Sequence, residues 1–276
     1  MLTVGYPGRE GAHSAGASAV LYPDARLLPL PSFRAVADAV TACEVEVGVL
    51  PIESSLVGPV AETHDLLYGS ALAIVAQTVL PIDHCLAGLA GAALESIRVV
   101  HSHPVALDQC RRLLGSLPLA TAVAAPTTAD AALEVARLGD PAHAAIASER
   151  AAALNGLAVL AANVGDHPEA YTRFVAVATH TRLDRNGTPF RTAFSFVTDH
   201  RPGSLYHALG PFARHGLNLV QLVSRPIPHS TFRYRFDMVL DGHPLDPEIR
   251  TALAEMGEWT REVRIFGSYE ATGSEI

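Results

Sequence analysis

The feature that most constrains this chain is a change of pattern near residue 180. Before it, short apolar runs alternate with helical patterns, whereas the remainder follows the order strand, helix, strand, strand, helix, strand. Strands that alternate with helices predict parallel βαβ units and therefore an α/β fold. The second order, over about 80 residues, is that of a ferredoxin-like α+β unit. We therefore expect two differently built parts.

The periodicity of apolar residues places the individual elements. In the first part it predicts strands over 2–6, 45–52, 98–101, 142–147, 157–161 and 172–178, and helices over 11–22, 60–68, 104–114 and 149–155. In the second part it predicts strands over 192–197, 217–223, 232–240 and 261–266, and helices over 203–215 and 247–256. Residues 181–190 are polar with Gly and Pro, which predicts a linker between domains at 1–180 and 191–276.

Composition excludes several classes of protein. The net charge of -8 disfavours nucleic acid as a partner. The chain has no Lys, which rules out Schiff-base catalysis by lysine. Its three cysteines have no metal-ligand spacing and indicate free thiols in a reducing compartment. We see neither a signal peptide nor a membrane span, so we expect a cytoplasmic protein.

Glycines and polar side chains follow the first two predicted strands. Gly5, Gly8 and Gly11 extend from the end of a predicted strand to the start of a predicted helix, and backbone amides at a helix start can hold an anion such as a carboxylate. The alternative is a tight turn that needs glycine. Ser54 and Ser55 come at the end of a strand, where α/β sheets place ligand sites, and they either line a site or cap the next turn.

Two further motifs lie at the ends of later elements. His101 and His103 flank Ser102 with a spacing that suggests metal ligands, but no third ligand has supporting spacing, so a structural or capping role is favoured. Thr172 and Arg173 open a strand. A guanidinium can bind a carboxylate through paired hydrogen bonds, and a threonine hydroxyl can donate to a leaving oxygen. These residues alone do not name a reaction.

These motifs, in this order, resemble those of the prephenate dehydratase family and its plant-type relatives, the arogenate dehydratases. The matching segments extend over nearly the whole chain and are residues 4–14, 50–55, 64–67, 80–86, 102–110, 145–148 and 172–174. The last of these, Thr172–Phe174, is the family's most diagnostic short motif. The tail resembles an ACT domain, a small-molecule sensing module, through residues 202–206 and 224–226.

The resemblance implies a fold and an assembly. The catalytic domain would have the two-lobed, periplasmic-binding-protein-like fold, with lobe one at about 1–77 and 165–180 and lobe two at about 78–164. Substrate would lie in the cleft, and hinge closure is expected. The ACT domain would bind phenylalanine between paired subunits and inhibit the enzyme, in a homodimer or homotetramer. The alternative is a domain that pairs the subunits without binding an effector.

The resemblance also implies a reaction and its residues. Prephenate would lose CO2 and water to give phenylpyruvate in phenylalanine biosynthesis, with no cofactor and no metal. Thr172 would donate to the leaving hydroxyl and Arg173 would clamp a carboxylate or organise the charges. The implied substrate-binding residues are Gly11, Ala12, Ser14, Glu53, Ser54, Ser55, Ser102, His103 and Phe174. The implied phenylalanine-binding residues are Gly203, Ser204, Leu205, Tyr206, Ser224, Arg225 and Pro226.

The chain departs from the family pattern at four positions. Ser54, Val105 and Ala170 stand where the family usually has Asn, Gln and Asn, which removes hydrogen bonds to a ligand. Val223 replaces the usual Glu of the effector motif, and Ala12 fits the arogenate pattern. Three alternatives therefore stay open, namely an arogenate dehydratase, a non-catalytic amino-acid sensor, and a dehydratase free of feedback control.

Overall fold

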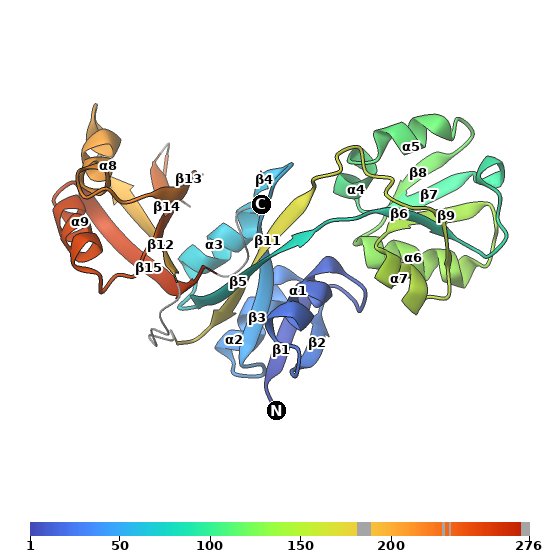
Figure 1. The fold of residues 1–276 in the computed structure, drawn as a ribbon, viewed down its shortest axis with the longest axis horizontal. Helices are drawn as coiled ribbons and strands as arrows, with labels where there is room; N and C mark the ends of the chain where they lie inside the picture. The colour runs from blue at the N-terminus through green and yellow to red at the C-terminus, as the bar shows by residue number, and fades with distance from the viewer. Residues whose placement is uncertain (181–188, 228–229, 232, 272–276) are drawn as a thin grey trace.

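The chain forms three β-sheets, and the sheet formed by the start of the chain lies between the other two (Figure 1). The computed structural model describes residues 1–180, 189–227, 230–231 and 233–271. Along the chain, most strands of the first two sheets are connected by helices, whereas the third sheet and its helices follow the order βαββαβ. The predicted fold class, a two-lobed α/β part followed by a ferredoxin-like α+β part, is confirmed.

The first sheet is mixed, with the strand order β2–β1–β3–β11–β5 and the short β4 paired to β3. Its strands are β1 (Thr3–Pro7), β2 (Arg26–Leu30), β3 (Val47–Ser54), β4 (Gly58–Pro59), β5 (Ala73–Pro81) and β11 (Tyr171–Ala178). The connecting helices are α1 (His13–Leu21), α2 (Phe33–Thr41) and α3 (Ala61–Gly69). Because β5 continues to Pro81, this sheet includes residues 78–81, which the boundary expected near 77 assigns to the second lobe.

The second sheet has the order β10–β6–β9–β7–β8. Its strands are β6 (Cys85–Gly88), β7 (Val99–Ser102), β8 (Thr121–Ala124), β9 (His143–Ala147) and β10 (Ala158–Ala161). Its helices are η1 (Leu94–Ser96), α4 (Pro104–Asp108), α5 (Arg111–Ser116), α6 (Thr128–Leu138) and α7 (Glu149–Leu154). The single helix predicted over 104–114 is wrong, because the Asp166 carboxylate accepts hydrogen bonds from the amides of Arg111 and Arg112, at 2.9 and 3.0 Å, and starts a separate helix there.

Two segments, 82–84 and 162–170, connect the first sheet to the second. They are hydrogen-bonded to each other at two points. The Ile82 amide donates to the Ala170 carbonyl at 2.8 Å, and the Val164 amide donates to the His84 carbonyl at 2.8 Å. A short double connection of this kind can serve as a hinge between two lobes.

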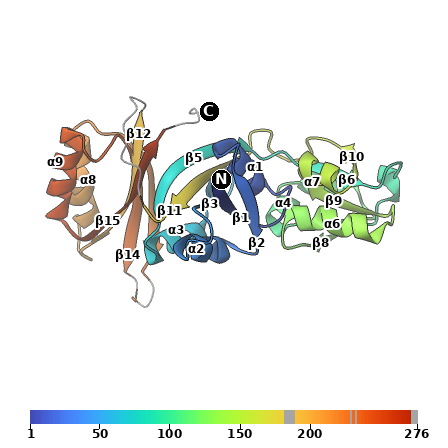
Figure 2. The ribbon, with the colours of Figure 1, turned by 90° about the horizontal axis from the view of Figure 1, so that it is seen from below.

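The third sheet is antiparallel, with the order β13–β14–β12–β15. Its elements are β12 (Phe190–Thr198), α8 (Ser204–Arg214), β13 (Leu219–Pro226), β14 (Tyr234–Asp241), α9 (Pro247–Gly257) and β15 (Thr260–Glu270). Both helices cover the face that points away from the first sheet (Figure 2). As predicted, Leu205, Leu209 and Phe212 face the core between these helices and the sheet.

The predicted linker at 181–190 lies outside the described residues up to residue 188, and Phe190 already begins β12. No helix within the described ranges is long and apolar enough to cross a membrane.

The other face of the third sheet packs against the first sheet. Gly267, with φ +148°, approaches β5 so closely that a Cβ atom there would lie 2.2 Å from the Ile74 carbonyl oxygen. Val239, Phe266 and Tyr269 join the buried apolar cluster that contains Ile74. The third sheet is therefore docked on the first through a continuous core.

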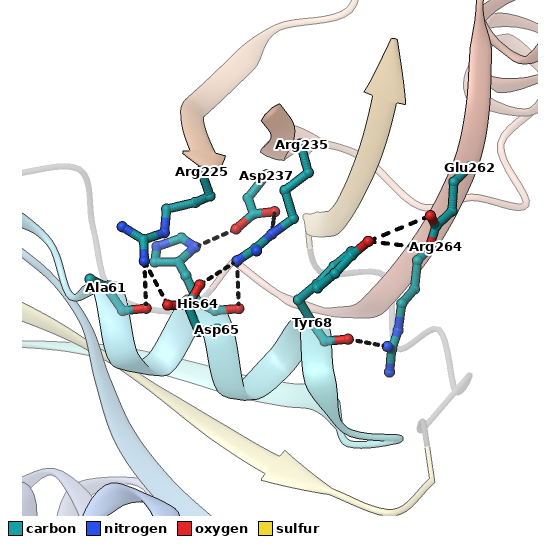
Figure 3. A network of polar contacts seen from close by, with 9 residues as sticks. All are labelled: Ala61, His64, Asp65, Tyr68, Arg225, Arg235, Asp237, Glu262 and Arg264. Carbon is teal, nitrogen blue, oxygen red and sulfur yellow. Dashed lines mark hydrogen bonds and ion pairs between the residues drawn. The ribbon is translucent and has the colours of Figure 1, made fainter. Parts of the chain in front are cut away.

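A buried polar network joins α3 to β14 at this interface (Figure 3). The fully buried Arg235 donates to the Asp65 carboxylate at 2.8 Å and to the Asp237 carboxylate at 3.1 Å. Its guanidinium carbon lies 4.2 Å from the centre of the Tyr68 ring. The His64 ring nitrogen Nδ1 lies 3.0 Å from the Asp237 carboxylate. Because a buried charge is tolerated only when it is paired, these contacts fix one position of α3 relative to the third sheet.

Candidate active site

A cavity of about 470 Å³ lies between the two lobes of the α/β part. Its walls include Gly8, Ser32 and Val57 from the first lobe and Ala106, Pro126 and Thr128 from the second. β1 and β3 end beside it, which is the place where α/β sheets bring polar loop residues together. The volume is in the range of small-molecule sites.

Six predicted site residues line this cavity, namely Ala12, Ser14, Ser54, His103, Thr172 and Phe174. Two of them also have the capping contacts considered as alternatives. The Ser54 hydroxyl accepts from the amides of Leu56 and Val57, both at 3.3 Å. The His103 ring accepts from the Val105 amide at 3.3 Å at the start of α4. Capping and cavity lining therefore coexist at these positions.

Arg173 and Glu53 are not among the described residues that line the cavity, so of the two roles expected for Arg173 this position fits an organiser of charges and not a direct carboxylate clamp. Side chains alternate along a strand, so Thr172 and Phe174 face the cavity while Arg173 faces the other side of the sheet. There its guanidinium donates to the Glu53 carboxylate at 2.7 Å across the β11–β3 pairing. Both side chains lie near Tyr269. Burial raises the pKa of Tyr269 to about 12, and the charge of Arg173 opposes part of this rise.

Three further predicted residues have structural contacts and, within the described chain, do not line the cavity. Gly11 has φ +91° and packs against α7, where a Cβ atom would lie 2.9 Å from the Cα of Ala151. The Ser55 hydroxyl accepts from the Tyr171 amide at 2.9 Å and fixes the end of β3 to the start of β11. The fully buried Ser102 donates to the Ile146 carbonyl at 2.7 Å and holds β7 to β9.

The cavity also contains residues that the sequence pattern did not single out as site residues. His13 begins α1, His84 lies in the first hinge segment, and Gln109 follows α4. The two histidines stand inside matched family segments, but their spacing along the chain gives no sign that they meet. Val105 and Ala170, two of the departures from the family pattern, line the cavity as well. Substitution at these two positions thus alters the walls of the cavity itself.

The electrostatics of the cavity favour neutral side chains. Burial, and next the nearby His84, lower the pKa of His13 to about 4. Burial also lowers the pKa of His84.

Burial raises the pKa of Cys85 to about 11 and that of Cys110 to about 12, so neither thiol is an activated nucleophile. No group of three or more possible metal ligands occurs within the described ranges.

The predicted effector residues lie at one end of the third sheet. Gly203, with φ +82°, precedes α8, which follows β12, and Ser224, Arg225 and Pro226 end β13. Tyr206 is 76% exposed on α8. Arg225 reaches the first lobe instead of solvent, because its guanidinium donates to the Asp65 carboxylate of α3 at 2.7 Å (Figure 3).

Comparison with known proteins identifies the family. The model of the prephenate dehydratase family matches residues 4–182. Arogenate dehydratase/prephenate dehydratase 1 of Arabidopsis thaliana, a chloroplastic protein, is 34% identical over 280 residues, which are 96% of this chain and 71% of the relative. A bifunctional N-acyl-homoserine lactone acylase/prephenate dehydratase of Komagataeibacter europaeus is 36% identical over 98% of this chain and 96% of its own length.

A solved structure extends this similarity to the fold of the whole chain. The prephenate dehydratase of Arthrobacter aurescens, solved in complex with L-Phe, is 31% identical and superposes with a TM-score of 0.88 over 98% of this chain and 90% of its own. The family match covers both lobes around the cavity, and Thr172–Phe174 lies within it. On this evidence the chain belongs to the prephenate dehydratase family.

Proposed function

We propose that this protein is a prephenate dehydratase that converts prephenate to phenylpyruvate, with arogenate as the alternative substrate. The observation that carries the proposal is the position of Thr172, which lines the cavity shared by both lobes in a chain of this family. The cavity can take a six-membered ring with a carboxylate, a hydroxyl and a pyruvyl side chain. The departures at Val105 and Ala170 change its walls but leave Thr172 in place.

The chemistry needs little from the protein. The bond between the ring and its carboxylate breaks, CO2 leaves, and the electron pair enters the ring. The carbon–oxygen bond at the opposite ring position then breaks, and the hydroxide takes up one proton from solvent and leaves as water. The ring becomes aromatic, so the driving force lies in the substrate. Thr172 donates a hydrogen bond to the leaving oxygen, and general-acid assistance of this kind is worth about 10²–10⁴-fold.

Arg173 then acts as a positioning residue. Its pairing with Glu53 joins β11 to β3 directly behind Thr172. Its neighbour Tyr269 belongs to β15 of the third sheet. Arg173 thereby connects the strand that carries Thr172 to the C-terminal part of the chain.

The test is product formation from prephenate and arogenate in parallel. A dehydratase gives phenylpyruvate from the first substrate or phenylalanine from the second, and the ratio of the kcat/KM values names the preferred one. A folded protein that binds phenylalanine but forms neither product would support the non-catalytic sensor and refute the dehydratase.

For the C-terminal part we propose an ACT domain that binds phenylalanine and pairs the subunits. Its βαββαβ order and the effector residues at one end of its sheet support this. The route to the active site would be α3, since Glu62 in its first turn lines the cavity and Asp65 holds Arg225. Equilibrium titration and sedimentation with phenylalanine test both points. Absence of micromolar binding would favour the feedback-free dehydratase.

A second candidate function is hydrolysis of an N-acyl-homoserine lactone, the other activity in the name of the Komagataeibacter relative. The apolar lining of the cavity favours it, since Phe33, Val57, Val60, Ile82 and Val105 could contact an acyl chain. Incubation with N-acyl-homoserine lactones of several chain lengths and detection of free homoserine lactone tests it. No release under conditions where prephenate is consumed would remove this candidate.

A further inference from the structure

The charge of the cavity does not match its proposed ligands. Prephenate and arogenate each carry two carboxylates, yet the described residues that line the cavity include no Arg or Lys and one carboxylate, that of Glu62. A carboxylate placed in such a site without a cation or enough hydrogen-bond donors pays a desolvation cost. The lining side chains that can acquire a positive charge are His13, His84 and His103.

Two of these histidines meet across the hinge. The rings of His13 and His84 lie edge to face, with their centres 5.9 Å apart. His84 is 5% exposed, and its Nε2 lies 3.1 Å from the amide oxygen of Gln109. Because that oxygen can only accept, Nε2 of His84 carries the proton and donates. The other ring nitrogen, Nδ1, is then unprotonated, and it has no hydrogen-bond partner among the described residues.

The protein surroundings of this pair favour its neutral form. Burial, and next the nearby His84, lower the pKa of His13 to about 4, and burial lowers the pKa of His84. The Asp83 carboxylate opposes the shift at both rings, as does the Gln109 hydrogen bond at His84. Glu62 is the other charged group on the cavity wall. A ligand carboxylate beside the rings would favour the protonated form, and repulsion between like charges limits the pair to one proton.

We propose that His13 and His84 form a carboxylate-binding subsite that takes up one proton from solvent when its ligand enters. The pair then supplies the counter-charge that the rest of the cavity lacks, and Nδ1 of His84 is the nitrogen at which that ring can take up the proton. The identity of the ligand, a ring acid or keto acid, rests on the proposed function. The subsite itself rests on the cavity and on the geometry of the two rings.

The test uses phenylpyruvate, which carries one of the two carboxylates and is not turned over by a dehydratase. Isothermal titration at pH 7.5 in buffers of different ionisation enthalpy measures the protons taken up on binding. We expect close to one proton for the wild type and none for His13→Gln or His84→Gln. Each variant should bind about 10–100-fold more weakly, as expected for loss of a hydrogen bond to a charged group. His200→Gln, at an exposed position in the third sheet's part of the chain, is the matched control and should behave as wild type.

The sign of the pH dependence follows from the proton uptake. Since the ligand selects the protonated pair, its Kd rises with pH, by up to about tenfold per unit between the pKa of the free pair and the higher pKa of the complex, and levels off above the latter. The two substitutions should flatten this profile. His13→Gln, at the less buried ring, serves as the second variant if His84→Gln does not fold.

The outcomes separate this subsite from the dehydratase reaction. Binding without proton uptake, or unchanged affinity in both variants, overturns the subsite even if prephenate is consumed. The subsite is also overturned if neither phenylpyruvate nor phenylacetate, a smaller ring acid with one carboxylate, binds at millimolar concentration. Proton-linked binding by a protein that turns over neither prephenate nor arogenate would keep the subsite and refute the dehydratase.

Discussion

At the scale of single residues, Thr172 is the side chain on which the proposed reaction depends. It lines the cavity, and the register places it opposite Ser54 on one side and Leu80 on the other. We expect Thr172→Ala to lower kcat by about 10²–10⁴-fold while KM changes little, because the hydroxyl acts on the departing oxygen. Thr172→Ser keeps the hydroxyl and should retain most of the activity. Steady-state kinetics would contradict this role if kcat in the alanine variant matched wild type.

Gly11 belongs to a motif predicted to bind substrate, but its contacts in the structure are packing contacts. Its φ of +91° and its contact with Ala151 join the glycine turn of the first lobe to α7 of the second. Gly139, with φ +61° and open space around it, is a matched control. We expect Gly139→Ala to lower the free energy of unfolding by about 1–2 kcal/mol through the left-handed backbone alone. Gly11→Ala should cost about 1–3 kcal/mol more, because the new methyl group meets backbone atoms. Urea unfolding measures both, and equal losses would refute the close-packing role.

Individual residues also show what the sequence could and could not predict of the site. Thr172, Ser14 and Ser54 could be predicted because they stand in short motifs at the ends of elements, and all three line the cavity. The orientation of Arg173 depends on the pairing of β11 with β3, which the motif does not reveal. The meeting of His13 with His84 likewise depends on how α1 is placed against the hinge.

At the scale of elements, the sequence pattern located some segments and missed others, among them the amphipathic helices α2 and α6, for which it predicts no element. The helix predicted over 247–256 matches α9 closely. No element was assigned to β2 or β5, since β2 contains Pro29 and β5 is a long run without polar alternation. The division of 104–114 into two helices depends on Asp166, which lies far along the chain. Local periodicity carries no information about such a partner.

The helix α3 makes a testable contribution to stability through Asp65. This carboxylate binds Arg225 and the fully buried Arg235, and its own side chain is 47% exposed. We expect Asp65→Asn to lower the free energy of unfolding by about 1–2 kcal/mol at pH 7, a figure reduced for solvent screening. Asp24→Asn, at an exposed position, is the control and should change it by less than about 0.5 kcal/mol.

The pH dependence of the Asp65 contribution has a defined sign. Burial raises the pKa of Asp65, but hydrogen bonds from Arg235 and Arg225 outweigh burial, so the pKa in the folded protein is lowered. A lowered pKa stabilises the fold above the unfolded value of about 3.9 and loses this effect as pH falls through the folded value. The difference between wild type and Asp65→Asn should therefore shrink below about pH 4. A difference that stays constant down to acid-induced unfolding would contradict the ion pairs.

At the scale of the whole molecule, the number of units was predictable but their docking was not. The α/β part ends with β11 at Ala178 and the βαββαβ part begins with β12 at Phe190, on either side of the change of pattern near residue 180. The docking of the third sheet on α3 rests on pairs such as Arg235 with Asp65, which are 170 residues apart. The local pattern around neither residue indicates this pairing. Long-range pairing of this kind requires the structure.

The arrangement of the lobes leads to a prediction about the shape of the molecule. Two hinge segments connect the lobes, and the cavity walls come from both, so a ligand gains contacts on each side when the lobes approach. We expect phenylpyruvate to reduce the radius of gyration in small-angle scattering. At the same ligand concentration, the radius of gyration of His84→Gln should fall by less, because this variant binds phenylpyruvate more weakly. Once it is saturated with ligand, the variant should match wild type. If saturated wild type keeps the radius of the free protein, the lobes do not close on this ligand, and the cavity must admit and release it in one conformation.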